Sequence, residues 1–342
     1  MKLSDFDYFL PRSAIAQYPL EERDASRMMV IKRAEKSISH HLFGEIDTFV
    51  MPGDVLVVND SRVIPARLYG WKETGGKVEL LLLKKHREER LAEIWDVLVR
   101  PARRVKVGTL IQLGEKAVAK VIERVDGKKW RLAFSVEGPF DKFLEAMGNV
   151  PLPPYIKRKD TPDDRARYQT IFAARPGSVA APTAGFHFSS RILEKIEARG
   201  AKVVPITLHV GYGTFLPIET EEVEDHRMEE EWYAVSERAA AEINKARRVI
   251  AIGTTSARVI ETVSDEKGVV RAGEGTTSLF IYPGYRFKRV DAMLTNFHLP
   301  RSSLLLMAAA FIGRDLLLTA YRLAVETGYR FYSYGDCTLL LP

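Results

Sequence analysis

Residues 279–313 read LFIYPGYRFKRVDAMLTNFHLPRSSLLLMAAAFIG, a stretch that places polar chemistry between apolar segments. Residues 279–282 and 285–294 are β-prone runs separated by a Pro-Gly pair, and they predict two strands. Residues 304–312 predict a helix, and because their apolar run is too continuous for an amphipathic helix, we expect this helix to be buried. The polar loop between the strand and the helix indicates the wall of an active site.

The predicted helix begins at Arg301, Ser302 and Ser303, close to His298. A helix start offers free backbone N–H groups and the positive end of a dipole, and here two hydroxyls and a guanidinium join them. This combination suits an anionic ligand. From this stretch alone an alternative stays open, in which the serines only cap the helix, His298 is a hydrogen-bonded histidine and Arg301 is solvated.

The composition is that of an ordinary soluble protein. The chain has 342 residues, 46% of them hydrophobic, a length that favours two domains with sizeable cores. Its 51 basic and 45 acidic residues leave a net charge of +6, which is weak evidence for a polyanionic partner. A single cysteine excludes an intrachain disulfide and cysteine-rich metal sites, and it fits the reducing cytoplasm. We expect a cytoplasmic monomer with no signal peptide and no membrane span.

The sequence pattern between residues 66 and 136 predicts a small β-barrel. Short β-prone runs separated by glycine- and proline-containing turns predict strands at residues 77–84, 94–99, 110–113, 117–125 and 130–136. The proline-rich connector at 149–154 is stiff, so it predicts the end of the barrel and a domain boundary. After the connector, residues 163–174 predict a helix.

Basic clusters in and after the barrel are candidate phosphate contacts. They are residues 84–87, 100–106 and 128–129, followed by Lys157, Arg158 and Lys159. Solvated loops are the commoner explanation of such clusters. Nearer the N-terminus, we expect Arg23, Asp24 and Arg27 to form an internal set of salt bridges.

Further candidate site residues follow predicted strands or precede predicted helices, where side chains often reach a ligand. Asp60 and Arg62 follow the apolar strand at 55–58, and His187 is a candidate acid or base just before a helix at 190–199. The other candidates are Gly185, Gly211, Gly213, Gly253, Thr254, Thr255, Tyr334 and Asp336. The turn that follows the strand at 248–252 suits a nucleotide-like ligand, but an ordinary capped turn fits it as well.

Several familiar catalytic signatures are absent from the sequence. It contains no HExxH motif, no P-loop, no Gly-x-Ser-x-Gly elbow and no zinc-deaminase signature, and its histidine spacing predicts no metal site. The residues alone therefore indicate an acid/base enzyme that binds a polyanion.

Seven sequence segments allow a more specific interpretation. They are PLEERDASRMMV, GDVLVVNDSRVIPARL, GSVAAPTAGFHF, LHVGYGTF, IGTTSARVIE, FIYPGYRFKRVDAMLTNFHLPRSSLLL and YRFYSYGD. Together they closely resemble the S-adenosylmethionine:tRNA ribosyltransferase-isomerases of queuosine biosynthesis. The resemblance implies an α+β multidomain fold in which a large mixed α/β domain, residues 1–62 and 151–342, carries the active site and a small β-barrel domain, residues 63–150, is inserted into it.

The same resemblance implies a substrate and a donor. The substrate is tRNA with 7-aminomethyl-7-deazaguanine at the wobble position, and the product is epoxyqueuosine-tRNA. S-adenosylmethionine is the co-substrate and gives its ribosyl group, so that adenine and methionine are released and no further cofactor is needed. The chemistry needs a base, an acid and oxyanion donors, which are expected roles for His187, His298, Asp336 and the Thr254-Thr255 backbone. An imidazole with an ordinary pKa of about 6.5 suits the proton transfers.

One position departs from the family pattern. Family members commonly have a second histidine where this chain has Glu229, within His226-Arg227-Met228-Glu229, so either that histidine is dispensable or Glu229 takes its role. Two other functions compete with the ribosyl transfer: an RNA methyltransferase that uses the same donor, and a non-catalytic RNA-binding module built on the barrel.

Overall fold

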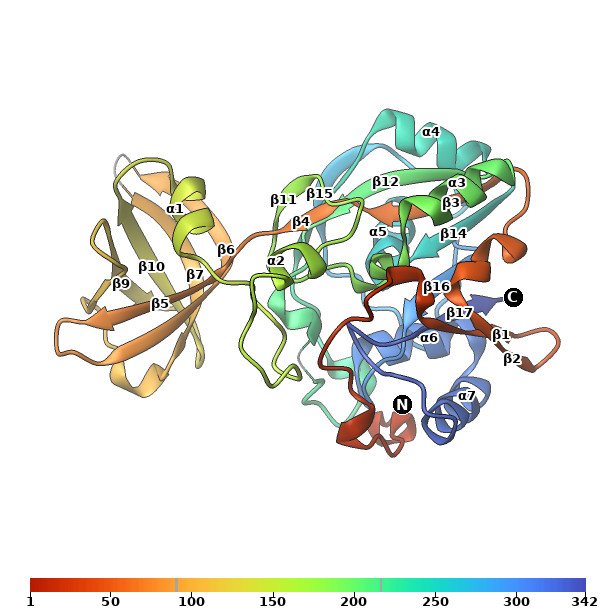
Figure 1. Ribbon diagram of the computed structural model, residues 1–342, viewed down its shortest axis with the longest axis horizontal. Helices are drawn as coiled ribbons and strands as arrows, with labels where there is room; N and C mark the ends of the chain where they lie inside the picture. Colours follow the sequence, from red (N-terminus) through yellow and green to blue (C-terminus); the bar gives the residue numbers. More distant parts are fainter. Residues whose placement is uncertain (90–91, 216) are drawn as a thin grey trace.

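The computed structural model describes residues 1–89, 92–215 and 217–342. A large α/β part is built on a nine-stranded sheet, and a closed barrel of strands projects from one side of it (Figure 1). Both chain termini lie on the large part. Short 3-10 helices connect many elements: Leu3–Phe6, Arg12–Ala14, η3 (Arg23–Ala25), η4 (Phe43–Phe49), Ala102–Arg104, Thr183–His187, Tyr212–Phe215 and Val223–Asp225.

The large sheet is mixed. Its strands, in order across the sheet, are β15 (Gly273–Thr277), β13 (Glu231–Val235), β12 (Lys202–Leu208), β3 (Asp54–Asn59), β14 (Arg248–Ile252), β16 (Ala292–Asn296), β17 (Cys337–Leu341), β1 (Arg27–Lys32) and β2 (Ser37–Leu42). The central strands β12, β3, β14 and β16 run parallel to one another, and β17 is antiparallel to β16. Parallel strands require cover on both faces, which explains why every residue of β3 is buried.

Helices cover both faces of this sheet. They are α3 (Ser190–Ala198), α4 (Glu237–Lys245), α5 (Thr254–Val263), α6 (Ser303–Ile312) and α7 (Arg314–Glu326). Because side chains alternate along a strand, Val55 and Val57 join the core formed with α4 to α7, whereas Leu56 and Val58 join the core formed with α3 and η4. The expected buried helix after Pro300 is confirmed as α6, with Ser302 accepting a hydrogen bond from the backbone N–H of Leu305.

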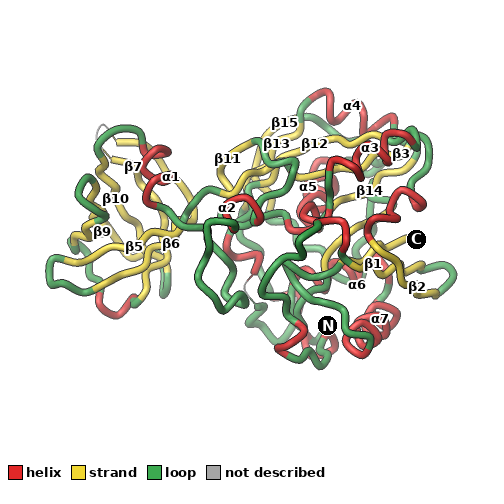
Figure 2. Tube along the Cα trace, viewed as in Figure 1, coloured by secondary structure: helices red, strands yellow, loops and turns green. Residues whose placement is uncertain are grey.

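The barrel confirms the expected fold class, since an α/β part is combined with a closed antiparallel sheet. It consists of β5 (Arg67–Lys72), β6 (Lys77–Glu89), β7 (Ala92–Arg100), β8 (Leu110–Gln112), β9 (Ala117–Arg124) and β10 (Lys129–Val136), and α1 (Phe140–Met147) covers one end. The run of strands and the near absence of helices in this part are plain in Figure 2. Trp95 stacks on Phe140 with ring centroids 5.9 Å apart, which ties α1 to the barrel core.

The barrel lies in sequence between β4 (Ser61–Val63) and β11 (Arg175–Ser178), which pair in parallel as a small second sheet. The predicted helix at 163–174 is much shorter than expected, because α2 spans only Asp164–Arg167 and Tyr168 leaves helical geometry. The ring of Tyr168 is fully buried among aromatic neighbours, so its packing ends the helix. Tertiary packing here overrides the local helical preference.

The two strands predicted at 279–282 and 285–294 are wrong except at the end of the second one. Only Ala292–Asn296 forms a strand, β16, and residues 278–291 run as a loop. At residues 288–290 the cause is Glu261 on α5, whose carboxylate accepts the backbone N–H groups of Lys288, Arg289 and Val290. These donors are therefore unavailable to a neighbouring strand.

No single helix among the described residues is long and apolar enough to cross a bilayer. Helices α6 and α7 meet that criterion only when taken together, as a pair bent by 117°.

Candidate active site

A cleft lies at the carboxyl ends of β14 and β16, the position where α/β sheets commonly bind ligands. Its free volume is about 40 Å³ and it is partly open to solvent, so the cleft is narrow in this structure and its walls must move apart to admit a small molecule. Its walls are Ala181, Pro182, Thr183, Ala184, Val210, Thr214, Gly253, Thr254, Thr255, Thr295, Asn296, Phe297, His298, Leu304, Tyr332 and Ser333. Of the expected site residues, this set brings together His298, Gly253, Thr254 and Thr255.

The start of α5 presents polar groups to this cleft. Gly253 has a φ of 88°, a conformation that favours glycine, and it turns the chain from β14 into α5. No side chain caps α5, whereas Ser189, Ser236 and Ser302 cap α3, α4 and α6. The hydroxyl of Thr255 is buried and has no hydrogen-bond partner in the structure. A buried hydroxyl is rarely left unpaired, so water or a ligand in the cleft is expected to bind it.

His298 reaches the cleft from the loop after β16. Its Nε2 lies 2.9 Å from the hydroxyl of Thr295, and its backbone is held on both sides, because the carbonyl accepts the Tyr8 hydroxyl and the N–H donates to Tyr321. Burial lowers the pKa of His298 to about 3. The imidazole is therefore neutral at neutral pH, and the expected pKa near 6.5 is wrong for this unliganded site.

His187 lies behind Asn296 and reaches the cleft only through it. Its Nδ1 is 2.7 Å from the Ser26 hydroxyl, and its Nε2 is 3.1 Å from the side-chain nitrogen of Asn296. That amide nitrogen also faces two carbonyl oxygens, of Tyr332 and Asp336, so it is a donor and His187 Nε2 accepts. Burial, and then the charges of nearby arginines, lower the pKa of His187 to about 3.

The carboxylate of Asp336 binds backbone N–H groups. Its two carboxylate oxygens accept the N–H groups of Arg27 at 2.9 Å and Arg330 at 2.7 Å. Burial raises its pKa, and the carboxylate is absent from the residues that line the cleft. In this structure Asp336 therefore ties the start of β1 to the turn before β17.

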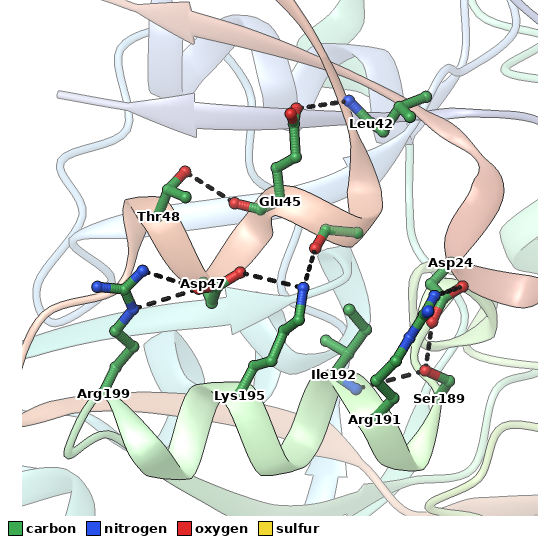
Figure 3. Close-up of polar contacts among 11 residues, drawn as sticks. Asp24, Leu42, Glu45, Asp47, Thr48, Ser189, Arg191, Ile192, Lys195 and Arg199 are labelled. Atoms are coloured by element: carbon green, nitrogen blue, oxygen red, sulfur yellow. Dashed lines mark hydrogen bonds and ion pairs between the residues drawn. The ribbon is translucent and has the colours of Figure 1, made fainter.

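Asp24 of η3 holds the start of α3, the helix that follows His187 in the chain. Figure 3 shows Asp24 accepting hydrogen bonds from the Ser189 hydroxyl at 2.5 Å and from Arg191 at 2.9 Å, at the start of α3. Farther along α3, Asp47 of η4 pairs with Lys195 and Arg199. The expected salt-bridge set of Arg23, Asp24 and Arg27 is therefore wrong, because Asp24 pairs with α3 instead.

A protein-family model described as "Queuosine biosynthesis protein" matches residues 3–340. The chain belongs to this family. A relative from Syntrophus aciditrophicus (strain SB) is 52% identical over 361 residues, with both chains covered completely, and is named S-adenosylmethionine:tRNA ribosyltransferase-isomerase. The relative from Moorella thermoacetica (strain ATCC 39073 / JCM 9320), 48% identical with the same coverage, has the same name. A crystal structure of S-adenosylmethionine tRNA ribosyltransferase from Thermotoga maritima is similar with a TM-score of 0.56 and 36% identity, covering 99% of this chain and all of that one.

Several residues expected to bind substrate in this queuosine-family protein make contacts within the fold. The guanidinium of Arg301 forms an exposed ion pair with Asp7, and the hydroxyl of Ser302 caps α6. Asp60 accepts the Thr207 hydroxyl at 2.6 Å, and burial raises its pKa. The remaining residues outside the cleft lining are Arg62, Gly185, Gly211, Gly213, Ser303 and Tyr334.

The basic segment after the connector divides into two kinds of residue. Arg158 binds both carboxylate oxygens of Asp164, at 2.6 and 2.8 Å, so it is structural. Lys157 and Lys159 are exposed on either side of it. In the barrel, Lys128 and Lys129 pair with Glu219 and Glu229 of the large part. The side chains of Arg87 and Arg104, from the other two clusters, lie outside what the structure describes.

Glu229, which replaces a histidine common in the family, is a contact between the two parts of the molecule. Besides its ion pair with Lys129 of β10, its carboxylate packs so closely on Gly213 that a Cβ there would come within 2.7 Å of it. It does not line the cleft. The residue therefore links the barrel to the loop that carries Thr214.

A buried ion pair that supports this loop was not predicted from the sequence. Glu231 and Arg258 are 5% and 3% exposed, and Glu231 accepts the N–H of Gly211 at 2.7 Å and the hydroxyl of Thr214 at 2.8 Å. A visible signal was Arg258 itself, a charge within the apolar turns of the predicted helix. Asn296 was likewise overlooked, although it stands within the motif that contains His298.

Proposed function

We propose that this protein transfers the ribosyl group of S-adenosylmethionine to tRNA and isomerises it. The substrate is the 7-aminomethyl-7-deazaguanine of the wobble position, the product is epoxyqueuosine-tRNA, and adenine and methionine leave. Membership of the queuosine family and the names of relatives about half identical over their full length support the reaction. The observation that carries the site assignment is the cleft in which the uncapped start of α5, the unpaired Thr255 hydroxyl and His298 converge.

The donor lies in this cleft, with a polar or anionic group at the start of α5. Free N–H groups of Thr254 and Thr255 and the positive dipole end favour such a group. The hydroxyl of Thr255 gains there the partner that it lacks in the free protein. This assignment replaces the start of α6, where Arg301 and Ser302 already have partners.

Chemistry begins at the ribose carbon next to the sulfonium, whose positive charge makes the methylene acidic. A base removes that proton, the ring opens toward loss of adenine, and adenine leaves as it takes up a proton. Ring opening breaks the C4′–O4′ bond, forms a C4′=C5′ double bond next to the sulfonium and leaves O4′ as an aldehyde oxygen on C1′. The amine of the tRNA base adds to C4′ and loses a proton, and the carbanion formed at C5′ attacks C1′ to close the carbon ring. The resulting alkoxide displaces methionine from C5′ and closes the epoxide.

His298 is our choice for the base, because its neutral imidazole lines the cleft directly. His187 contacts the cleft only through Asn296, whose amide donates to its Nε2, so we assign it the role of holding this amide in the wall of the cleft. Its imidazole stays neutral in this role, because burial disfavours the imidazolium. Asp336 acts indirectly, by fixing the turn at 330.

The barrel and the exposed Lys157 and Lys159 hold tRNA through its phosphates. This proposal rests on the clustering of these charges beside the cleft-bearing part rather than inside the cleft. The domain bounds at residues 63 and 150, the monomeric state and the cytoplasmic location stay predictions.

Product chromatography tests the function. The protein is incubated with S-adenosylmethionine and tRNA that carries the precursor base, and the small molecules are separated. Adenine and methionine in equal amounts support the proposal. S-adenosylhomocysteine would instead show methyl transfer, and binding of tRNA without any product from the donor would show an RNA-binding module.

A further inference from the structure

A second hollow lies on the other side of His187 from the donor cleft. Arg23, Arg167, Phe186, His187 and Tyr334 are among its walls, and Ser333 lines both hollows. The imidazole of His187 is the partition, since it faces this hollow while its Nε2 contacts Asn296 of the cleft. A ligand in the second hollow therefore lies next to the reaction site.

Two half-buried guanidinium groups make this hollow positively charged. Arg23 donates to the carbonyls of Phe186, Ala166 and Gln169, and Arg167 donates to those of Leu20 and Glu21. Within the described part of the chain, neither forms an ion pair with a carboxylate. Neutral carbonyls orient the two arginines but leave both positive charges uncompensated.

The charges are also close enough to disfavour each other. The pKa of Arg23 is lowered by burial and then by the charge of Arg167. A guanidinium has five N–H donors, and the contacts above use three of those of Arg23. The Nε of Arg167 is buried with no hydrogen-bond partner. Donors thus remain for an anion that would relieve the repulsion.

An aromatic wall completes the hollow. The rings of Phe186 and Tyr334 stack at 5.9 Å with an interplanar angle of 28°, and the Tyr334 hydroxyl donates to Asp164 at 2.9 Å. Both rings are buried, at 7% and 3% exposed, so they shape the hollow while the two arginines supply its charge.

We propose that the second hollow binds a backbone phosphodiester of tRNA next to the nucleotide that is modified. The inference rests on the proposed function, because it places the polynucleotide on one side of His187 and the donor on the other. Two forked cations match the oxygens of a phosphodiester. The carboxylate of the donor is the other available anion, but the start of α5 already offers uncapped N–H groups to it within the cleft.

The test is the salt dependence of tRNA binding by Arg167→Gln, measured without donor so that turnover plays no part. Loss of a phosphate contact on a single-stranded loop should lower the slope of log affinity against log salt by about 0.7 and weaken binding several-fold at low salt. Arg167→Lys, which keeps the charge, should retain most of the slope. Affinity for S-adenosylmethionine should not change.

Arg165→Gln is the matched control. Arg165 stands two positions earlier on α2 and also donates to backbone carbonyls, those of Glu145 and Gly148, but it lines a different hollow. Its slope should equal that of the unmodified protein. If Arg167→Gln does not fold, as judged from its melting temperature, Arg23→Gln on the facing wall carries the same expectation.

Three results would overturn the proposal: an unchanged slope for folded Arg167→Gln, an equal drop for Arg165→Gln, or a loss of donor affinity with tRNA binding intact. The last would assign the hollow to the donor carboxylate. Failure of the ribosyl transfer itself is distinguishable, because it appears as absent adenine release by the unmodified protein whatever the slopes are.

Discussion

Asn296 donates its side-chain amide to Nε2 of His187 at 3.1 Å, and this contact joins the cleft to the second hollow. The hydroxyl of Thr183 donates to the oxygen of the same amide at 2.9 Å. The amide is thus locked in one orientation, and it sets which nitrogen of His187 carries the proton. His187 and Thr183 therefore hold the Asn296 side chain in the wall of the cleft, although the cleft does not expose the histidine directly.

Asn296→Asp should raise the pKa of His187 by more than about one unit, because a carboxylate in contact with the ring stabilises the imidazolium. Its value in the unmodified protein is about 3. Adenine release should fall at least about tenfold, since Nε2 loses its fixed donor. Ring-proton titration by NMR measures the pKa. Asn244→Asp, at an amide that bonds only Val270, is the control, and an equal response there would contradict the assignment.

Thr255→Val should weaken binding of S-adenosylmethionine by up to about tenfold, the usual net worth of one hydrogen bond. Stability should hold or rise, because the hydroxyl has no partner in the free protein. Calorimetric titration and melting temperature give the two quantities. Ser256→Ala is the neighbouring control: its hydroxyl donates to Ile252 at 2.9 Å, so stability should fall while donor affinity stays. Unchanged affinity of Thr255→Val for S-adenosylmethionine would show that the donor does not contact the hydroxyl of Thr255.

Acid should destabilise the protein through its buried histidines. His187 and His298 have folded-state pKa values of about 3 against an ordinary 6.5. Between these values the unfolded chain binds more protons, so stability is present above pH 6.5 and is lost as the pH falls, by at most about 1.4 kcal/mol per unit for each histidine. Urea unfolding between pH 7 and 4 should show a shallower loss for His298→Gln. A slope identical to that of the unmodified protein would show that His298 is not held neutral.

Glu231→Gln should cost about 3 kcal/mol or more of stability, because it leaves Arg258 buried without its counter-charge. The loop at 211–214 should loosen, and the KM for the donor should rise more than kcat falls. Denaturant unfolding and steady-state kinetics measure these effects. Glu242→Gln, which removes an exposed pair with Lys202, should change neither. A stable variant with normal kinetics would show that the buried pair does not support the cleft.

Patterns with a strong local cause were predictable from the sequence. The strands at 117–125 and 130–136 follow from alternation and turn residues, and α6 follows from an apolar run behind a serine cap. The strand β5 was missed because Gly70 interrupts its pattern. A Cβ at Gly70 would come within 2.6 Å of the Gln112 carbonyl, so the glycine permits close pairing with β8.

The predictions were wrong where side chains far away in the sequence determine the local structure. Glu261 takes the N–H groups of a predicted strand, and the partner of Asp24 lies on a helix far along the chain. His298 could be named from its loop, yet its low pKa comes from burial that only the tertiary structure creates. The unpaired hydroxyl of Thr255 is likewise invisible in a sequence.

Isotope labelling of the donor tests most directly the central claim that the ribosyl group, and not the methyl group, is transferred. S-adenosylmethionine is labelled with deuterium in its methyl group and with heavy carbon in its ribose, and it is incubated with the protein and tRNA that carries the precursor base. The tRNA is then digested, and its nucleosides are weighed by mass spectrometry. We expect the modified nucleoside to gain the heavy-carbon ribosyl unit and no deuterium, while the deuterium is recovered in methionine. Deuterium in the tRNA, with heavy carbon retained in S-adenosylhomocysteine, would contradict the account.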